Sequence, residues 1–254
     1  MNDNRQTWDE RARALGATRR GVLFKGFTDE ANGRLHDWHA WLVREMFAPA
    51  IGAEGGAVLD LGCGYGRLSQ TLATARPDLF VVGQDISGWY CQRMAEGGGG
   101  AVLADLRALP FRPRSMAGAM AITSLMYLDR PEVGAAFAQI AAMLRPGAPL
   151  LIVDPGEELR SLIGRLAGNR VASATGGRGF QREEYIALAR AAGFEVLGKG
   201  GNPRDSALLL ATAGGRVGWG LVSRLAGRQR PRAGGYSPLA LHRWLLLKAP
   251  GEGR

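Results

Sequence analysis

The chain has 254 residues, of which 46% are hydrophobic, and this length is enough to bury a substantial core. Its two cysteines are too few for a disulfide framework or a metal knuckle. The longest segment without a charged residue, 115–128, is shorter than the roughly 20 apolar residues of a membrane span, and the polar first residues do not resemble a signal peptide. We therefore expect a folded, metal-free, cytoplasmic protein.

The first 55 residues contain one clear amphipathic helix, GRLHDWHAWLVREMF at 33–47, whose apolar residues recur at helical spacing. A segment of this size is too small to fold as an independent domain and too large for a simple tail. We expect residues 1–55 to form a helical cap that packs over the main domain, residues 56–254.

From residue 57 onward, short apolar runs alternate with amphipathic segments of helix length. This alternation is typical of an α/β fold in which helices cover both faces of a mostly parallel sheet. The apolar runs lack strict alternation with polar residues, which favours strands buried on both faces. The predicted strands are 57–61, 79–83, 101–104, 117–123, 148–153 and 194–198.

The helix with the most complete boundary signals is 131–147, because Pro131 suits a first turn and Gly147 suits the residue just past the end. Either 207–213 (ALLLATA) or 242–249 (HRWLLLKA) can supply the last strand. We favour the second segment, which makes residues 205–240 an insertion near the C-terminus.

The first predicted strand runs into VLDLGCGYG at 58–66, a turn with glycines at 62, 64 and 66. A strand, a glycine-rich turn and a helix starting near Arg67 direct free backbone N–H groups at a ligand. The dinucleotide fingerprint G-x-G-x-x-G would place its third glycine at Arg67, so the spacing departs from that of an NAD site.

Acidic residues follow three consecutive predicted strands. Asp60 precedes the glycine turn, where its carboxylate would repel a pyrophosphate and attract a cation. Asp85 ends the second strand, where a carboxylate can accept hydrogen bonds from both hydroxyls of a ribose. Asp105 follows the third strand, at the edge where open parallel sheets bind ligands. The three acids favour S-adenosylmethionine (SAM), which carries an ammonium and a sulfonium and no phosphate.

Five segments in order, VLDLGCGYG, VVGQDIS, ADLRALPF, AMAITSLMYL and MLRPGAPLLIVD, resemble the class I SAM-dependent methyltransferases. The likeness is greatest to the ubiquinone and menaquinone biosynthesis methyltransferases and related small-molecule enzymes. It implies a Rossmann-like sheet of seven strands with an antiparallel last strand. It also implies a SAM site formed by Asp60, Gly62, Gly64, Gly66, Asp85, Ile86, Asp105, Leu106, Ile122 and Thr123.

Four residues are candidates for contact with the methyl acceptor. His36 and His39 lie three residues apart near one helical face and can act as bases, although a partly exposed face of the cap helix explains them as well. The resemblance directs Tyr127 and Asp154 toward the rim of the pocket, where Asp154 would orient a hydroxyl or cap the next helix.

The excess positive charge lies in the last third of the chain, and residues 216–232 carry five arginines and no acid. Such a segment can lie on an anionic membrane surface, or it can form a lid over the pocket. Because this charge lies outside the expected reaction centre, a nucleic-acid substrate is disfavoured. The segment motivates the hypothesis of an apolar or lipid-linked acceptor met by a peripheral contact with the membrane.

The sequence thus predicts a SAM-dependent methyltransferase that acts on a small molecule, with a hydroxyl oxygen as the first choice of acceptor. The alternatives are a nitrogen or carbon acceptor, a non-catalytic SAM-binding protein and an NAD-dependent oxidoreductase. Asp60 and the missing third glycine weigh against the oxidoreductase.

Overall fold

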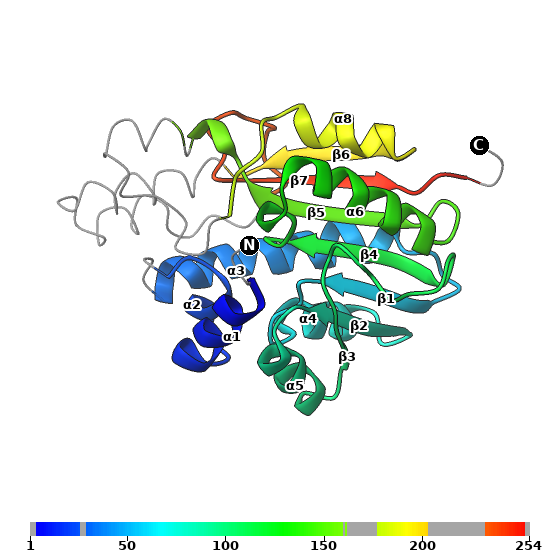
Figure 1. Ribbon diagram of the computed structural model, residues 1–254. Coiled ribbons are helices and arrows are strands. Elements are labelled where there is room, and N and C mark those ends of the chain that lie inside the picture. Colours follow the sequence, from blue (N-terminus) through cyan, green and yellow to red (C-terminus); the bar gives the residue numbers. More distant parts are fainter. Residues whose placement is uncertain (1–3, 26–28, 160, 162–176, 203–231, 252–254) are drawn as a thin grey trace.

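The computed structural model describes residues 4–25, 29–159, 161, 177–202 and 232–251. The described strands form one seven-stranded sheet in the order β3-β2-β1-β4-β5-β7-β6 (Figure 1). Strands β1 to β5 pair in parallel, whereas β7 is antiparallel to both β5 and β6. The strands are β1 (Gly56–Leu61), β2 (Leu79–Asp85), β3 (Gly100–Leu103), β4 (Met116–Ile122), β5 (Pro149–Pro155), β6 (Glu195–Gly201) and β7 (His242–Lys248).

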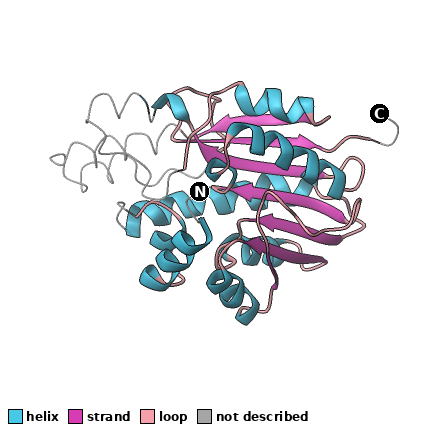
Figure 2. Ribbon diagram, in the orientation of Figure 1, coloured by secondary structure: helices cyan, strands magenta, loops and turns pink. Residues whose placement is uncertain are grey.

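Helices cover both faces of the sheet, as predicted (Figure 2). On one face, Phe137 of α6 (Arg130–Met143) and Ile186 of α8 (Glu184–Ala191) pack against apolar side chains of β1, β4 and β5. On the other face, α4 (Arg67–Ala75) contributes buried Leu68 and Leu72 to a second core that includes Met120 of β4. Helix α5 (Gly88–Glu96) lies beside β2 and β3.

The N-terminal segment contains α1 (Asn4–Leu15), α2 (Arg19–Val22) and α3 (Asp29–Leu42). A π-helical turn, Val43–Phe47, and a 3-10 turn, Ala48–Ala50, extend α3 toward β1. Leu35 and Phe47 are fully buried in the same core as α4, so α3 belongs to the helical layer that covers the sheet. Helices α1 and α2 lie near the carboxyl ends of the parallel strands (Figure 1).

The predicted strands agree with the observed ones to within three residues, and 242–249 is the segment that supplies the last strand. Helix α6 ends at Met143, earlier than Gly147 indicates, because Arg145 N–H donates to Met116 O and pulls the chain onto β4. Of the expected insertion, the alternative strand 207–213 and residues 216–231 of the basic segment lie outside the described residues.

Candidate active site

The turn after β1 forms a cradle of backbone N–H groups at the carboxyl edge of the sheet. Gly62, Gly64 and Gly66 all have positive φ, between 56° and 83°, which is the left-handed region that glycine adopts without strain. A Cβ atom on Gly62 would lie 2.5 Å from the Cβ of Ser124, so the close approach of the loop after β4 also requires glycine there. The N–H groups of Gly62 and Cys63 both donate to the backbone oxygen of Gln84 and tie the turn to β2.

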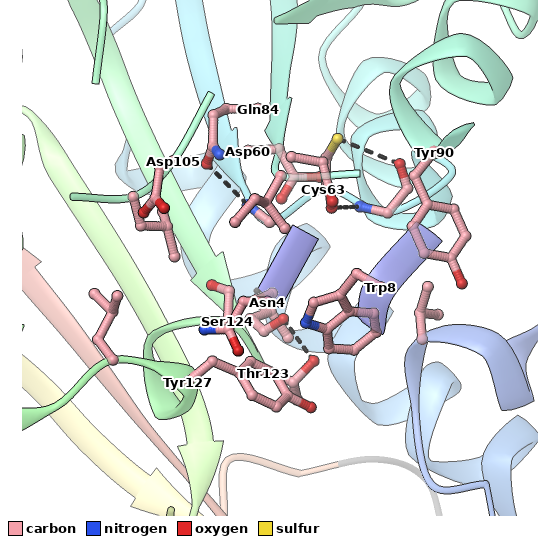
Figure 3. A pocket seen from close by; sticks show the side chains of 18 of the residues that line it. Asn4, Trp8, Asp60, Cys63, Gln84, Tyr90, Asp105, Thr123, Ser124 and Tyr127 are labelled. Atoms are coloured by element: carbon pink, nitrogen blue, oxygen red, sulfur yellow. Dashed lines mark hydrogen bonds between the residues drawn. The ribbon is translucent and has the colours of Figure 1, made fainter. Parts of the chain in front are cut away.

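A pocket of about 800 Å³, part of it open to solvent, lies over this turn (Figure 3). The carboxyl ends of β1, β2 and β4 form its floor, and α1 and α2 contribute Asn4, Trp8 and Val22. It is lined by nine of the residues predicted for the SAM site, namely Asp60, Gly62, Gly64, Asp85, Ile86, Asp105, Leu106, Ile122 and Thr123.

Asp60 places a buried carboxyl group at the start of the turn. Its Oδ2 accepts a hydrogen bond of 2.6 Å from the hydroxyl of Ser69 on α4. Burial raises the pKa of Asp60 to about 6, opposed by the Ser69 hydrogen bond and the charge of Arg67. A buried carboxyl group that is costly to ionise gains from a cation brought beside it, so Asp60 favours a positively charged ligand.

Asp85 is held by the backbone on both of its oxygens. Gly64 N–H donates to Oδ2 at 2.8 Å, and Ser87 N–H donates to Oδ1 at 2.9 Å. Burial raises the pKa of Asp85 to about 6 in spite of these hydrogen bonds. Each carboxylate oxygen can accept a further bond, so Asp85 is oriented to receive two hydroxyl donors.

Asp105 and Leu106 also line the pocket, at the edge beyond β3. Arg107 Nη1 lies 3.0 Å from Asp105 Oδ2, and Arg107 Nε lies 2.7 Å from Glu132 Oε1 on α6. This pair of ion contacts anchors the loop that carries Leu106, so that an apolar side chain and a carboxylate border the same side of the cavity.

The loop after β4 contains a strained residue and an unsatisfied hydroxyl. Thr123 has φ of 60°, a conformation that is costly for a β-branched side chain, and its N–H donates to Val153 O at 2.7 Å. The next residue, Ser124, is buried, lines the pocket, and its hydroxyl has no hydrogen-bond partner among the described residues. The hydroxyl of Tyr90, a pocket-lining residue of α5, is also buried and has no hydrogen-bond partner among the described residues. Unsatisfied polar groups in a cavity are expected where a polar ligand binds.

The N-terminal helices close the other side of the pocket. Trp8 of α1 meets Tyr127 edge-to-face, with the ring centroids 5.1 Å apart (Figure 3). Asp9, the next residue, accepts a hydrogen bond from the hydroxyl of Ser87 at the start of α5. This contact docks α1 beside the end of β2, which brings an aromatic wall to a pocket whose floor is polar.

The two histidines predicted as catalytic residues do not line the pocket. His39 is fully buried, with its ring stacked on that of His242 at a centroid distance of 5.2 Å. His36 is partly buried, and its Nδ1 lies 3.2 Å from Nη1 of Arg67. Burial and the charge of Arg67 lower the pKa of both imidazoles, to about 4 in the case of His36. Neither ring is placed to remove a proton from an acceptor in the pocket.

Asp154 and Gly66 also lie outside the pocket lining. Asp154 is buried under α8, where the hydroxyl of Tyr185 donates to its Oδ2 at 2.8 Å. Burial raises the pKa of Asp154 to about 8, so the carboxyl group is largely protonated at neutral pH. Gly66 supplies the left-handed residue that precedes α4 and packs beside Met94. Of the four candidates for acceptor contact, Tyr127 alone lines the pocket.

Several lining residues were not predicted from the sequence, among them Arg67, Gln84, Tyr90 and Ser124. Arg67 is the first residue of α4 and occupies the position at which the dinucleotide fingerprint would have its third glycine. Its place after the glycine turn is the signal that could have marked it, because the first residue of that helix must lie beside the ligand cradle. Ser124 lies one residue beyond the predicted strand and had no such signal.

Within the described residues, no group of histidine, cysteine, aspartate and glutamate side chains is arranged to hold a metal ion. A helix long and apolar enough to cross a membrane is likewise absent from the described part of the chain.

Comparison with known proteins agrees with this geometry. Residues 58–147 match the methyltransferase domain family. The O-methyltransferase cnsE of Penicillium expansum is 38% identical over 122 residues, which cover 44% of this chain and 43% of that protein. The O-methyltransferase rstn1 of Aspergillus nomiae is 33% identical over 121 residues, which cover 44% of this chain and 52% of that protein. The chain therefore spans about half the length of these curated relatives.

Solved structures match nearly the whole chain. The [4+2]-cyclase SpnF is 22% identical with a TM-score of 0.63, and the match covers 97% of this chain and 95% of SpnF. The magnesium protoporphyrin IX methyltransferase of Synechocystis PCC 6803 with bound SAM is 15% identical with a TM-score of 0.60, and 98% of each chain is covered. At these identities the likeness establishes the fold alone, a Rossmann-like seven-stranded sheet, mostly parallel and covered by helices.

Proposed function

We propose that this chain transfers the methyl group of SAM to a hydroxyl oxygen of a small molecule. The observation that carries this proposal is the convergence of Asp60, Asp85 and Asp105 on one pocket above a glycine turn. An acid beside the turn suits a cationic sulfonium ligand and opposes a pyrophosphate. The family match of residues 58–147 and the partial likeness to O-methyltransferases support the same reaction.

The described residues fit SAM by the chemistry of their polar groups. The carboxylate of Asp60 suits the cationic end of SAM, and the carboxylate of Asp85 suits the ribose hydroxyls. Asp105 and Leu106 suit the adenine, which needs a polar edge and an apolar face. The unpartnered hydroxyls of Ser124 and Tyr90 offer further hydrogen bonds inside the pocket.

When bound, SAM supplies an activated methyl group that an oxygen nucleophile can take in an in-line displacement. The task of the protein is then to hold donor and acceptor in line and to exclude water. Trp8 and Tyr127 form an aromatic wall of the pocket. With Val22 and Leu128 they offer a surface suited to a planar or apolar acceptor, such as a phenol.

The predictions of a lipid-linked acceptor and of a membrane contact rest on residues outside the described pocket. A likeness to the ubiquinone and menaquinone enzymes and the basic residues of 216–232 both favour a lipid-linked acceptor, met at a membrane surface. Co-sedimentation with anionic liposomes tests this contact, using the intact protein and a variant with serines in place of the arginines of 216–232. Equal sedimentation of the two proteins would contradict it.

The reaction is tested by incubating the protein with methyl-labelled SAM and a panel of phenols and aliphatic alcohols. The same assay should include fractionated extract of the source cells. We expect label in an O-methyl ether that is chemically stable to base, which distinguishes it from a methyl ester. Tight SAM binding without transfer to any compound or fraction would instead favour a non-catalytic SAM-binding protein. Label in an amine or at carbon would identify one of the alternative acceptor atoms.

A further inference from the structure

Arg67 places a half-buried positive charge at the wall of the pocket. It begins α4 directly after the glycine turn, and it lines the cavity together with Asp60. Burial lowers the pKa of its guanidinium to about 10, so the group remains charged at neutral pH. The position of this cation, beside the turn and near the acid of β1, is not explained by any packing requirement of the helix.

Two histidines contact the guanidinium, and a third contacts one of them. Arg67 Nη1 lies 3.2 Å from Nδ1 of His36, and Arg67 Nη2 lies 3.4 Å from Nδ1 of His39. Because a guanidinium can only donate, both Nδ1 atoms must be acceptors, and the proton of a neutral His39 ring is on Nε2. His39 Nε2 lies 3.0 Å from Nδ1 of His242, the first residue of β7. This Nδ1 atom therefore accepts the hydrogen bond from His39. The lowered pKa values of His36 and His39 are consistent with neutral rings.

This arrangement orients the guanidinium without an ion pair. Imidazole nitrogens accept two of its five N–H donors and bring no negative charge. Among the described residues, Arg67 forms no salt bridge, although the carboxyl group of Asp60 lies near enough for its charge to act on the pKa of Arg67. A partly desolvated cation without a direct partner gains from an anion brought into contact with it.

We propose that Arg67 binds the carboxylate of the amino-acid part of SAM, while His36 and His39 act as positioning residues that orient its guanidinium. The inference rests on the proposed function and deepens it. An amino acid carries an ammonium and a carboxylate on one carbon, and the wall of the pocket offers Asp60 and Arg67 on either side of the glycine turn. The pair of opposite charges therefore matches a zwitterion, whereas either charge alone would not.

Binding of three ligands separates the contribution of the carboxylate from that of the rest of SAM. S-adenosylmethionine carries the carboxylate, decarboxylated SAM lacks only that group, and 5′-methylthioadenosine lacks the whole amino acid. Dissociation constants for all three should be measured by calorimetry with the intact chain, Arg67→Gln and Arg112→Gln. Arg112 is exposed, is not among the pocket-lining residues, and serves as the matched control.

We expect Arg67→Gln to weaken SAM binding by about 10- to 100-fold, the usual range for a hydrogen bond between charged groups. Binding of decarboxylated SAM and of 5′-methylthioadenosine should stay within about twofold of the intact chain, which also shows that the variant is folded. Arg112→Gln should leave all three constants unchanged.

Two results would overturn the inference. Unchanged SAM affinity in Arg67→Gln would mean that the cation serves another anion, such as an acidic group of the acceptor. Equal losses for all three ligands would mean that Arg67 is required for the fold of the pocket. Either result leaves methyl transfer itself intact, whereas failure of the intact chain to bind SAM would contradict the proposed function first.

The positioning role has its own test. His39→Phe removes an acceptor from the guanidinium while keeping a buried ring, and it should weaken SAM binding by about 3- to 10-fold. His39→Asn, whose amide oxygen can accept, should recover part of this loss. In the Arg67→Gln background, His39→Phe should have no further effect on SAM affinity, because the residue acts through Arg67. Additive losses in the double variant would contradict this role.

Discussion

The lining of the pocket has two parts that are built in different ways. The first part, the acids and the glycine turn, comes from consecutive strand ends between residues 58 and 106. The second part comes from α1, α2 and the loop after β4, which are more than 100 residues apart in the chain. The two parts meet where Val22 and Ser124 approach the glycines of the turn. Local sequence order determines the first part, whereas long-range packing assembles the second. We expect the first part to respond to changes in the donor SAM, and the aromatic residues of the second to changes in the acceptor.

The largest expected effect is at Asp85. Asp85→Ala removes two acceptor oxygens from the ribose site, and we expect SAM affinity to fall by about 100-fold. The variant also frees the Gly64 and Ser87 N–H groups, so Asp85→Asn is the matched control, with one acceptor retained and a smaller loss. Calorimetric titration measures both. An unchanged dissociation constant in Asp85→Ala would place the ribose elsewhere.

The pH dependence of SAM binding tests the two buried acids, Asp60 and Asp85, of the first part of the lining. The pKa values of Asp60 and Asp85 are raised to about 6, so both groups are mostly ionised at pH 7 and mostly protonated at pH 5. A cationic ligand with ribose donors binds the ionised forms. Affinity should therefore fall as pH decreases through 6, by about tenfold from pH 7 to pH 5 for each group that must ionise.

The analogue 5′-methylthioadenosine sharpens this measurement, because it keeps the ribose and lacks both positive charges of SAM. Its affinity should depend on the ionisation of Asp85 alone and fall less steeply with decreasing pH. A pH-independent dissociation constant for SAM would contradict a role for either carboxylate.

Trp8→Ala tests the second part of the pocket lining. Removing the ring opens the aromatic wall that it forms with Tyr127, so the KM for the acceptor should rise by about five- to tenfold. The dissociation constant of SAM should change by less than about twofold. Trp89→Ala is the matched control, because Trp89 stacks with Arg93 on α5 and is not among the pocket-lining residues. A larger loss of SAM affinity than of acceptor affinity would contradict the assignment of Trp8 to the acceptor.

The smallest expected effect is that of His36→Asn on kcat. At saturating SAM and acceptor we expect a change of less than about threefold, because the ring does not line the pocket and its pKa of about 4 makes it a weak base. A general base would lose about 100-fold or more. Initial rates at saturation measure this difference, and a loss of that size would restore His36 as a catalytic residue.

The strands and the position of the acids at the pocket were predictable because their signals are local. An apolar run that ends in an acid predicts a buried strand and places the acid at the carboxyl edge of the sheet. Asp60 and Asp85 are examples. The same logic found Asp105 and Thr123 from the positions of their strand ends. The seven strands agree with the prediction to within three residues. The central strands β4 and β5 are buried on both faces, as predicted, whereas β6 alternates between exposed and partly buried residues because it lies at the edge of the sheet.

The histidines show why the rest could not be predicted. Their spacing placed His36 and His39 near one helical face, and that much is consistent with α3. The residues that this helical face contacts depend on how α3 packs against the sheet. In the structure the face contacts Arg67 and His242. Asp154 was predicted at the rim of the pocket for a similar reason. Its carboxyl group instead accepts a hydrogen bond from Tyr185, because α8 packs over the end of β5.

The central claim is that the pocket at the carboxyl edge binds SAM in preference to a dinucleotide. Calorimetric titration of the intact chain with SAM and with NAD, repeated on Asp85→Ala, tests it most directly. We predict saturable binding of one SAM per chain, weakened in Asp85→Ala, and no measurable binding of NAD. Tight NAD binding in the absence of SAM binding would contradict the account and favour an oxidoreductase.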